Sequence, residues 1–136
     1  MQNVRQLWKA GRLVVANVAV ADTFWRRAVG LLGRRALPPG AGLWLTPCAA
    51  VHTVGMRFSL DLIFLGRDLR VVRVARNVPA NRLVRGGRGA HSALEIAAGW
   101  LPADALHPGD PLTWSGGLEL PRRKTGQPQP GPSAGG

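Results

Sequence analysis

Residues 60–75 read LDLIFLGRDLRVVRVA, and this stretch decides the fold class. It begins with an almost continuous apolar run, which has the length of a fully buried strand. Gly66-Arg67-Asp68 follows and is typical of a tight turn, and valines then alternate loosely with arginines up to Ala75. Alternation with a period of two indicates a strand with one buried face. The stretch therefore predicts a β-hairpin.

Further strands are predicted on both sides of the hairpin, where branched and apolar residues form short runs bounded by glycine and proline. These runs cover residues 12–21, 42–46, 91–97 and 112–114. Asp22 and Thr23 are helix-capping residues that predict a short amphipathic helix over residues 24–32, and residues 100–106 are a candidate helical turn. The pattern predicts a mostly β fold, either a compact β-sandwich or a partly open barrel with one or two short helices.

The chain of 136 residues has the length of one domain. We expect an N-terminal lead-in over residues 1–11, a single β domain over residues 12–116, and a disordered basic tail rich in proline and glycine over residues 117–136. The tail has too few apolar residues to offset its ordering entropy. Cys48 is the single cysteine, so the chain contains no internal disulfide.

The charge is strongly positive, because 18 basic residues stand against 7 acidic ones and give a formal net charge of +11. Such an excess attracts polyanions. An arginine-rich composition with few lysines and no tyrosine is also typical of a GC-rich genome. The arginines are scattered and no base-reading motif accompanies them. Binding to nucleic acid is therefore possible and is expected to be non-specific.

The apolar run from Leu13 to Ala21 follows several basic residues and is similar to a secretion signal. Asn17 interrupts the run, however, and its valines suit a strand. No apolar run reaches the roughly 18 residues that a membrane-spanning helix needs. We expect a soluble cytoplasmic protein without a membrane span.

Two carboxylates lie among apolar residues, where an ionised group is costly unless donors satisfy it. Asp61 is expected to accept hydrogen bonds from residues 52–57 and so to hold that loop in place. Alternatively, Asp61 orients His52 as an acid, a base or a ligand. Glu95 is expected to point to solvent from a strand with one buried face.

Cys48 and His52 are separated by three residues, a spacing that suits two metal ligands or a thiolate activated by an imidazole. Two ligands do not complete a closed zinc site. Packing of a small apolar cysteine near the core is the favoured interpretation. We therefore predict no metal and no cofactor.

Five blocks of the sequence resemble the family named domain of unknown function 192. In chain order they are RxxGLLGR, GLW, HTxGMRFxLDLIFL, LExxxG and GD, at residues 27–34, 42–44, 52–65, 94–99 and 109–110. The resemblance extends from about residue 12 to residue 114. The central block departs from the Trp-Met-Lys-Asn-Thr pattern of many relatives, although it keeps Thr53 and Asp61.

The resemblance implies a mostly β fold and no established reaction. It directs attention to His52, Thr53, Asp61 and Glu95, with Cys48 and Arg57 as neighbours. If the domain is catalytic, the candidate residues are His52, Asp61 and Glu95, and the candidate binding residues are Thr53, Arg57 and Cys48. We predict a non-catalytic accessory or binding module with a small ligand or a protein as partner. The alternatives are a small hydrolase-like enzyme that uses His52 and Asp61, and non-specific polyanion binding through the arginines.

Overall fold

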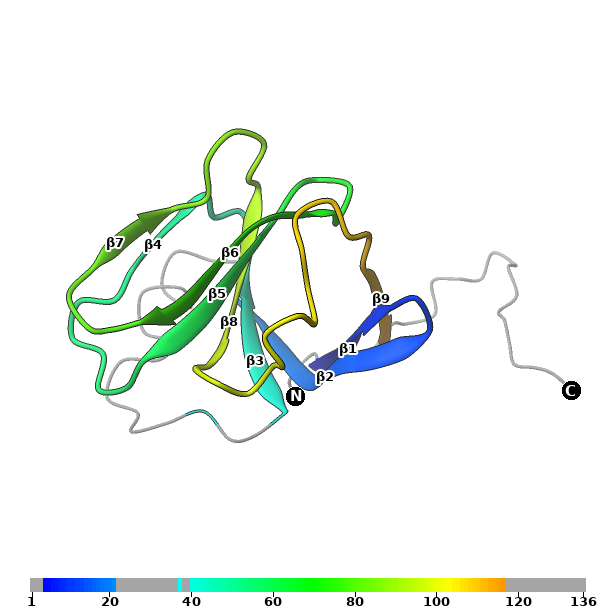
Figure 1. Ribbon diagram of the computed structural model, residues 1–136, viewed down its shortest axis with the longest axis horizontal. Helices are drawn as coiled ribbons and strands as arrows, with labels where there is room; N and C mark the ends of the chain where they lie inside the picture. The colour runs from blue at the N-terminus through cyan, green and yellow to red at the C-terminus, as the bar shows by residue number, and fades with distance from the viewer. Residues whose placement is uncertain (1–3, 22–36, 38–39, 117–136) are drawn as a thin grey trace, which may run out of the picture.

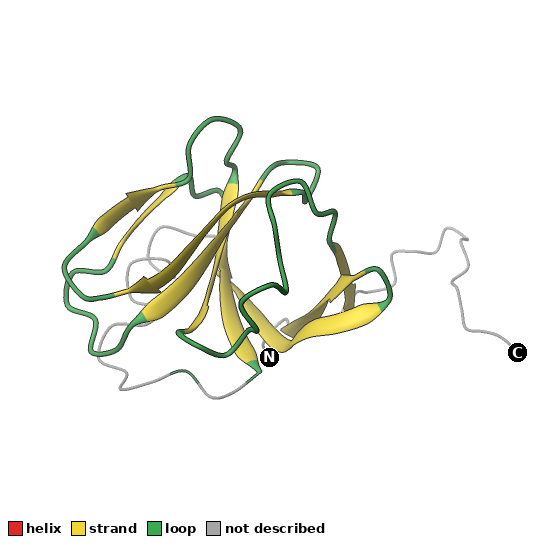
Figure 2. Ribbon diagram, in the orientation of Figure 1, coloured by secondary structure: helices red, strands yellow, loops and turns green. Residues whose placement is uncertain are grey.

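The structure is a computed structural model that describes residues 4–21, 37 and 40–116 (Figures 1 and 2). In this part of the chain all regular structure is β, which confirms the prediction of a mostly β fold. The strands are β1 (Val4–Lys9), β2 (Arg12–Ala21), β3 (Ala41–Leu45), β4 (Ala50–His52), β5 (Leu60–Leu65), β6 (Val71–Val78), β7 (Leu83–Arg85), β8 (Ser92–Ala97) and β9 (Thr113–Gly116).

The structure tests one of the two helical segments that the sequence predicted. Residues 24–32 lie outside the described residues. Residues 100–106 form turns instead of a helix, with a hydrogen bond from the amide of Ala105 to the carbonyl of Pro102 at 3.1 Å. None of the described segments forms a helix that is long and apolar enough to cross a membrane.

Seven strands form one curled sheet in the order β6-β5-β8-β3-β2-β1-β9 (Figure 1). β2 and β3 are parallel, and the other neighbours are antiparallel. The two ends of the sheet approach each other, because the amide of Val71 donates to the carbonyl of Asp110 at 2.9 Å and the amide of Gly109 donates to the carbonyl of Val71 at 2.7 Å. The sheet is therefore a half-barrel, which agrees with the partly open barrel expected from the sequence.

The hairpin predicted over residues 60–75 is confirmed as β5 and β6, and β5 lies between β6 and β8. The side chains of the hairpin point alternately to the two faces of the sheet, and each face carries one hydrophobic cluster. The inner cluster lies within the curl and contains Leu7, Val15, Val18, Ile63, Leu65, Val71, Leu94, Ile96, Leu101, Leu106 and Leu112. The outer cluster lies on the other face, where β4 and β7 form a second, two-stranded sheet, and contains Leu37, Leu45, Val51, Leu60, Leu62, Phe64, Val78 and Ala93.

β1 is a strand that the sequence pattern did not indicate. Its residues, VRQLWK, were assigned to a lead-in because they show no clear alternation. In the structure β1 lies between β2 and β9, and Leu7 is fully buried in the inner cluster. The two strands of the small sheet, β4 and β7, were also missed, since three residues give no measurable period.

Gly86 is required where the chain leaves β7 and passes Phe64. A β-carbon at Gly86 would lie 2.5 Å from the β-carbon of Ala90 and 2.5 Å from Cδ1 of Phe64, which is closer than carbon atoms can approach. We predict that Gly86→Ala lowers the free energy of unfolding by about 1–3 kcal/mol, because the buried ring of Phe64 must shift. Urea denaturation measures the loss. The exposed substitution Ala50→Ser is the control, and an unchanged midpoint for Gly86→Ala would contradict the close packing.

Candidate functional site

The three candidate catalytic residues face three different surroundings. His52 is exposed on β4 opposite Leu83, while its neighbour Val51 points into the outer cluster. Asp61 pairs with Ile96 of the inner cluster, and Glu95 pairs with Leu62 of the outer cluster. Because neighbouring side chains of two paired strands share a face, Asp61 and Glu95 point to opposite faces of the large sheet.

Asp61 is 1% exposed and its carboxylate accepts three hydrogen bonds. Oδ1 accepts from the amide of Asn77 at 2.7 Å, and Oδ2 accepts from the amide of Gly99 at 3.2 Å and from Nη1 of Arg76 at 3.3 Å. The prediction that residues 52–57 supply these donors is wrong. Those residues belong to the outer side of the sheet, whereas Asp61 faces the inner side.

Arg76 extends this network to the segment that follows β8. Its guanidinium donates to the carbonyls of Leu101 at 2.9 Å, Pro102 at 2.7 Å and Ala103 at 3.2 Å. A planar guanidinium can bind several acceptors in a fixed geometry. Asp61 and Arg76 together therefore hold residues 99–103 against the hairpin of β5 and β6.

Thr53 is buried and joins the loop after β4 to the connection between β6 and β7. Its hydroxyl donates to the carbonyl of Pro79 at 2.7 Å and accepts from the amide of Arg82 at 2.9 Å. Its own amide donates to the carbonyl of Arg82 at 2.8 Å. Thr53 thus fixes two loops, and Arg57 lies exposed in the same loop after β4.

Glu95 is 6% exposed, so the prediction that it points to solvent is wrong. β8 lies inside the large sheet between β5 and β3, and both of its faces are covered. The carboxyl group stands between Leu62 and Leu43 on the two adjacent strands. Burial in these apolar surroundings raises the pKa of Glu95 to about 7.

Cys48 packs against the outer cluster, as the favoured interpretation of the sequence expected. Its thiol donates to the carbonyl of Ala50 at 3.1 Å, and its amide donates to the carbonyl of His91 at 2.7 Å. Within the described ranges, no three His, Cys, Asp or Glu side chains gather closely enough to hold a metal ion.

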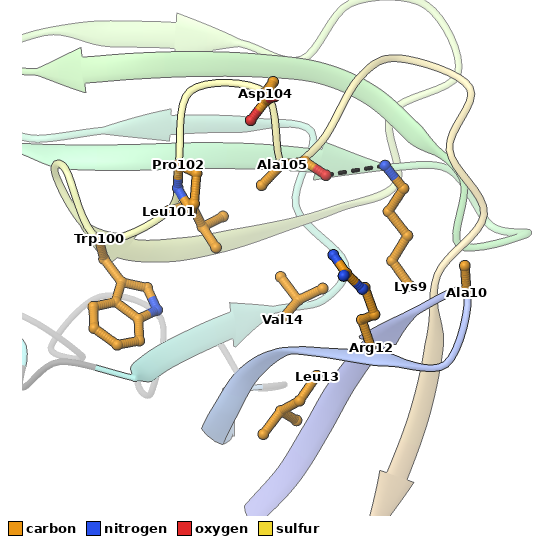
Figure 3. Close-up of a pocket in the computed structure, with 10 residues that line it drawn as sticks. All are labelled: Lys9, Ala10, Arg12, Leu13, Val14, Trp100, Leu101, Pro102, Asp104 and Ala105. Atoms are coloured by element: carbon orange, nitrogen blue, oxygen red, sulfur yellow. Dashed lines mark hydrogen bonds between the residues drawn. The ribbon is translucent and has the colours of Figure 1, made fainter.

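An open cleft of about 810 Å³ lies between the hairpin of β1 and β2 and residues 100–105 (Figure 3). Figure 3 shows Arg12 and Val14 pointing from β2 into the cleft. Trp100 and Leu101 stand opposite, on the segment that Arg76 holds in place. The cleft is lined by Lys9, Ala10, Arg12, Leu13, Val14, Trp100, Leu101, Pro102, Asp104 and Ala105.

The two basic residues of the cleft differ in their partners. Lys9 donates to the carbonyl of Ala105 at 3.0 Å and pairs with Asp110 at 2.8 Å. The hydrogen bond from Lys9, together with one from the amide of His107, lowers the pKa of Asp110. Arg12, in contrast, is exposed and has no hydrogen-bond partner within the described part of the chain. The charge of Arg12 is therefore available to a ligand.

Sequence reasoning missed this cleft. Its residues come from two segments that are about ninety positions apart in the sequence. Arg12 and its neighbours indicated only a strand, and Trp100 indicated only the start of a helical turn. Closure of the sheet brings these segments together.

We predict that Asp61→Asn lowers the free energy of unfolding by about 3 kcal/mol. Both oxygens of Asp61 accept hydrogen bonds. Asparagine would replace one of them with an NH₂ group, which is a donor facing another donor. Urea denaturation measures this change. Asp68→Asn is the matched control, because Asp68 is an exposed carboxylate 3.7 Å from Arg70 and should contribute less than about 0.5 kcal/mol. Equal midpoints for the two variants would argue against a structural role for Asp61.

We predict that the wild-type protein becomes less stable as the pH rises from about 4.5 to about 7. The folded state binds the proton of Glu95 more tightly than the unfolded state does, since burial raises its pKa from 4.5 to about 7. The wild type should lose about 3 kcal/mol of its free energy of unfolding over this pH range. Glu95→Gln should abolish that pH dependence. Denaturation curves at several pH values test it, and the same slope in both proteins would contradict the assignment to Glu95.

Comparison with known proteins gives a family and a fold. The model of the family DUF192, described as Uncharacterized ACR, matches residues 6–114. A crystal structure of a protein of unknown function from Novosphingobium aromaticivorans is 25% identical, covers 82% of this chain and 84% of that chain, and has a TM-score of 0.71. A crystal structure of a putative transcription regulator from Sinorhizobium meliloti is 22% identical, covers 84% of this chain and 94% of that chain, and also has a TM-score of 0.71.

No functionally curated protein matches the chain. The matched residues 6–114 include the GLW, HTxGMRFxLDLIFL, LExxxG and GD blocks, and nearly all of the half-barrel. The chain therefore belongs to the family of domain of unknown function 192.

Proposed function

We propose that this chain is a non-catalytic binding module, and that its cleft takes a small organic molecule with one anionic group and an apolar body. The observation that carries the proposal is the open cleft of about 810 Å³ into which the guanidinium of Arg12 points, without a hydrogen-bond partner among the described residues (Figure 3). This volume lies in the range of ligand-binding pockets, which are mostly apolar and contain a few well-placed polar groups.

Arg12 supplies the anion-binding group. A guanidinium carries five N–H donors and matches a carboxylate or a sulfonate in a bidentate geometry. Lys9 beside it is already paired with Asp110. Asp104 on the opposite wall disfavours a ligand whose negative charge extends across the cleft. The charges therefore favour one anionic group next to Arg12.

Val14, Trp100 and Leu101 supply an apolar surface for the rest of the ligand. Trp100 is 41% exposed, which is unusual for so large an aromatic side chain in a small domain. An indole face of this kind stacks on a planar apolar group. Because Arg76 fixes the carbonyls of residues 101–103, this wall is already formed without a ligand.

The alternative of a hydrolase would need His52 next to Asp61. The carboxylate of Asp61 instead bonds with Arg76, Asn77 and Gly99, and His52 is exposed on the small sheet. This arrangement supports a role for the family motif in fixing loops, and it favours binding over catalysis.

The test uses two fluorescent probes that differ in their charge, anilinonaphthalene sulfonate and the neutral phenylnaphthylamine. We expect the folded protein to bind the anionic probe more tightly. Arg12→Gln should weaken binding of the anionic probe by about tenfold and leave binding of the neutral probe unchanged, since it removes only a charged hydrogen bond. Trp100→Ala should weaken binding of both probes by about tenfold, because it removes apolar contact area.

Arg57→Gln is the matched control, because it removes an exposed arginine from the loop after β4, away from the cleft. It should bind both probes like the wild type. An Arg12→Gln variant that binds the anionic probe with wild-type affinity would overturn the proposal, as would a loss of equal size in Arg57→Gln.

A further inference from the structure

Five exposed arginines gather at one end of the molecule, and none of them lines the cleft. They come from the connection between β5 and β6, from the connection between β7 and β8, and from the adjoining parts of β6 and β7. We call this set the basic surface, and it consists of Arg67, Arg70, Arg73, Arg85 and Arg88.

Several contacts show that the two connections adjoin. The amide of His91 donates to the carbonyl of Leu65 at 2.8 Å, and a β-carbon on Gly66 would lie 3.5 Å from the carbonyl oxygen of Gly89. Figure 1 shows both connections at the same end of the molecule. Arg67 and Arg88 each lie next in sequence to a residue of these contacts, so the two connections carry both arginines to the same end of the molecule.

Two of the guanidiniums are fixed by backbone carbonyls. Nη1 of Arg73 donates to the carbonyl of Arg85, which links β6 to β7. Nη1 of Arg70 donates to the carbonyl of Gly109 at 2.9 Å. Each of these bonds uses one of the five N–H donors of its guanidinium and leaves the others for a ligand. The positions of these two charges are thus set before any ligand binds.

The basic surface is poorly neutralised. Within it the described acidic side chain is Asp68, at 3.7 Å from Nε of Arg70. Both side chains of this pair are more than half exposed, so the pair is weak and screened by salt. The nearby Asp110 already forms an ion pair with Lys9. Five cationic groups therefore face one carboxylate.

We propose that the basic surface binds the phosphate backbone of a nucleic acid without reading its sequence. Guanidiniums match phosphates in a bidentate geometry, and several of them at spaced positions suit a chain of repeated phosphates. Neither connection carries an exposed large hydrophobic side chain that could insert into a bilayer, since the four in the described residues are Leu13, Val54, Leu83 and Trp100. This absence favours a nucleic acid over a lipid surface.

The test measures fluorescence anisotropy of a labelled short DNA duplex of random sequence with the full-length protein. Five phosphate contacts give a slope of about −4.5 in a plot of the logarithm of the association constant against the logarithm of the salt concentration. The double variant Arg67→Gln and Arg88→Gln should lower this slope by about 2 and weaken binding. Neither side chain bonds to another described residue, so the variant should fold normally.

The matched control is the double variant Arg57→Gln and Arg82→Gln. It removes two exposed arginines from the opposite end of the hairpin and leaves the net charge equal to that of the first variant. We expect it to keep the wild-type slope to within about 0.5. Equal losses in the two double variants would overturn the proposal, because general charge would then explain the binding.

Vesicles of phosphatidylcholine and phosphatidylserine provide the second arm of the test. We expect the wild type to bind these vesicles more weakly than it binds DNA. Binding to vesicles that depends on Arg67 and Arg88, without such a dependence for DNA, would overturn the proposal and assign the basic surface to membranes. Failure of this test would leave the proposed cleft ligand untouched, since Arg12 is not part of the basic surface.

Discussion

The ion pair between the buried Asp61 and the partly buried Arg76 holds the segment that follows β8 against the hairpin of β5 and β6. Asp61 lies on β5, next to the edge strand β6, and accepts hydrogen bonds from β6 and from the turn after β8. Arg76 continues the network to the carbonyls of residues 101–103, which form one wall of the cleft. A buried pair is retained at a cost in desolvation only where its geometry is well satisfied. Here the pair acts together with the burial of Leu101 in the inner cluster to position the chain after β8.

Asp61 and Glu95 show how one sheet treats two carboxyl groups differently. They lie on the adjacent strands β5 and β8 and point to opposite faces. The inner face offers Asp61 three donors. The outer face surrounds Glu95 with apolar side chains, and the resulting loss of hydration favours the protonated carboxyl group. Their environments, and not their positions in the sequence, thus determine their chemistry.

The sequence predicted the elements that have a clear period or composition. The run at Leu60–Leu65 identified β5 because it is apolar on both faces, and the pattern over residues 12–21 identified β2 with its observed bounds. The pattern of β1 is too irregular to be recognised, and its place between β2 and β9 depends on tertiary closure. The burial of Asp61 was predicted correctly, but its donors were not, because the choice of face depends on strand pairing. The cleft was missed because it joins Arg12 to Trp100 across the closed sheet.

The pairing of β1 with β9 has a consequence for the order of events during synthesis. Arg5 pairs with Gly116, so β1 can complete its pairing only after β9 has been synthesised. Until then β1 has an unpaired edge, which is a template for aggregation in a nascent chain. Pairing over so large a sequence separation also makes folding slow in comparison with a helical domain of this size. A chain truncated just before β9 should therefore depend on chaperones, although it would contain every buried residue of the inner cluster.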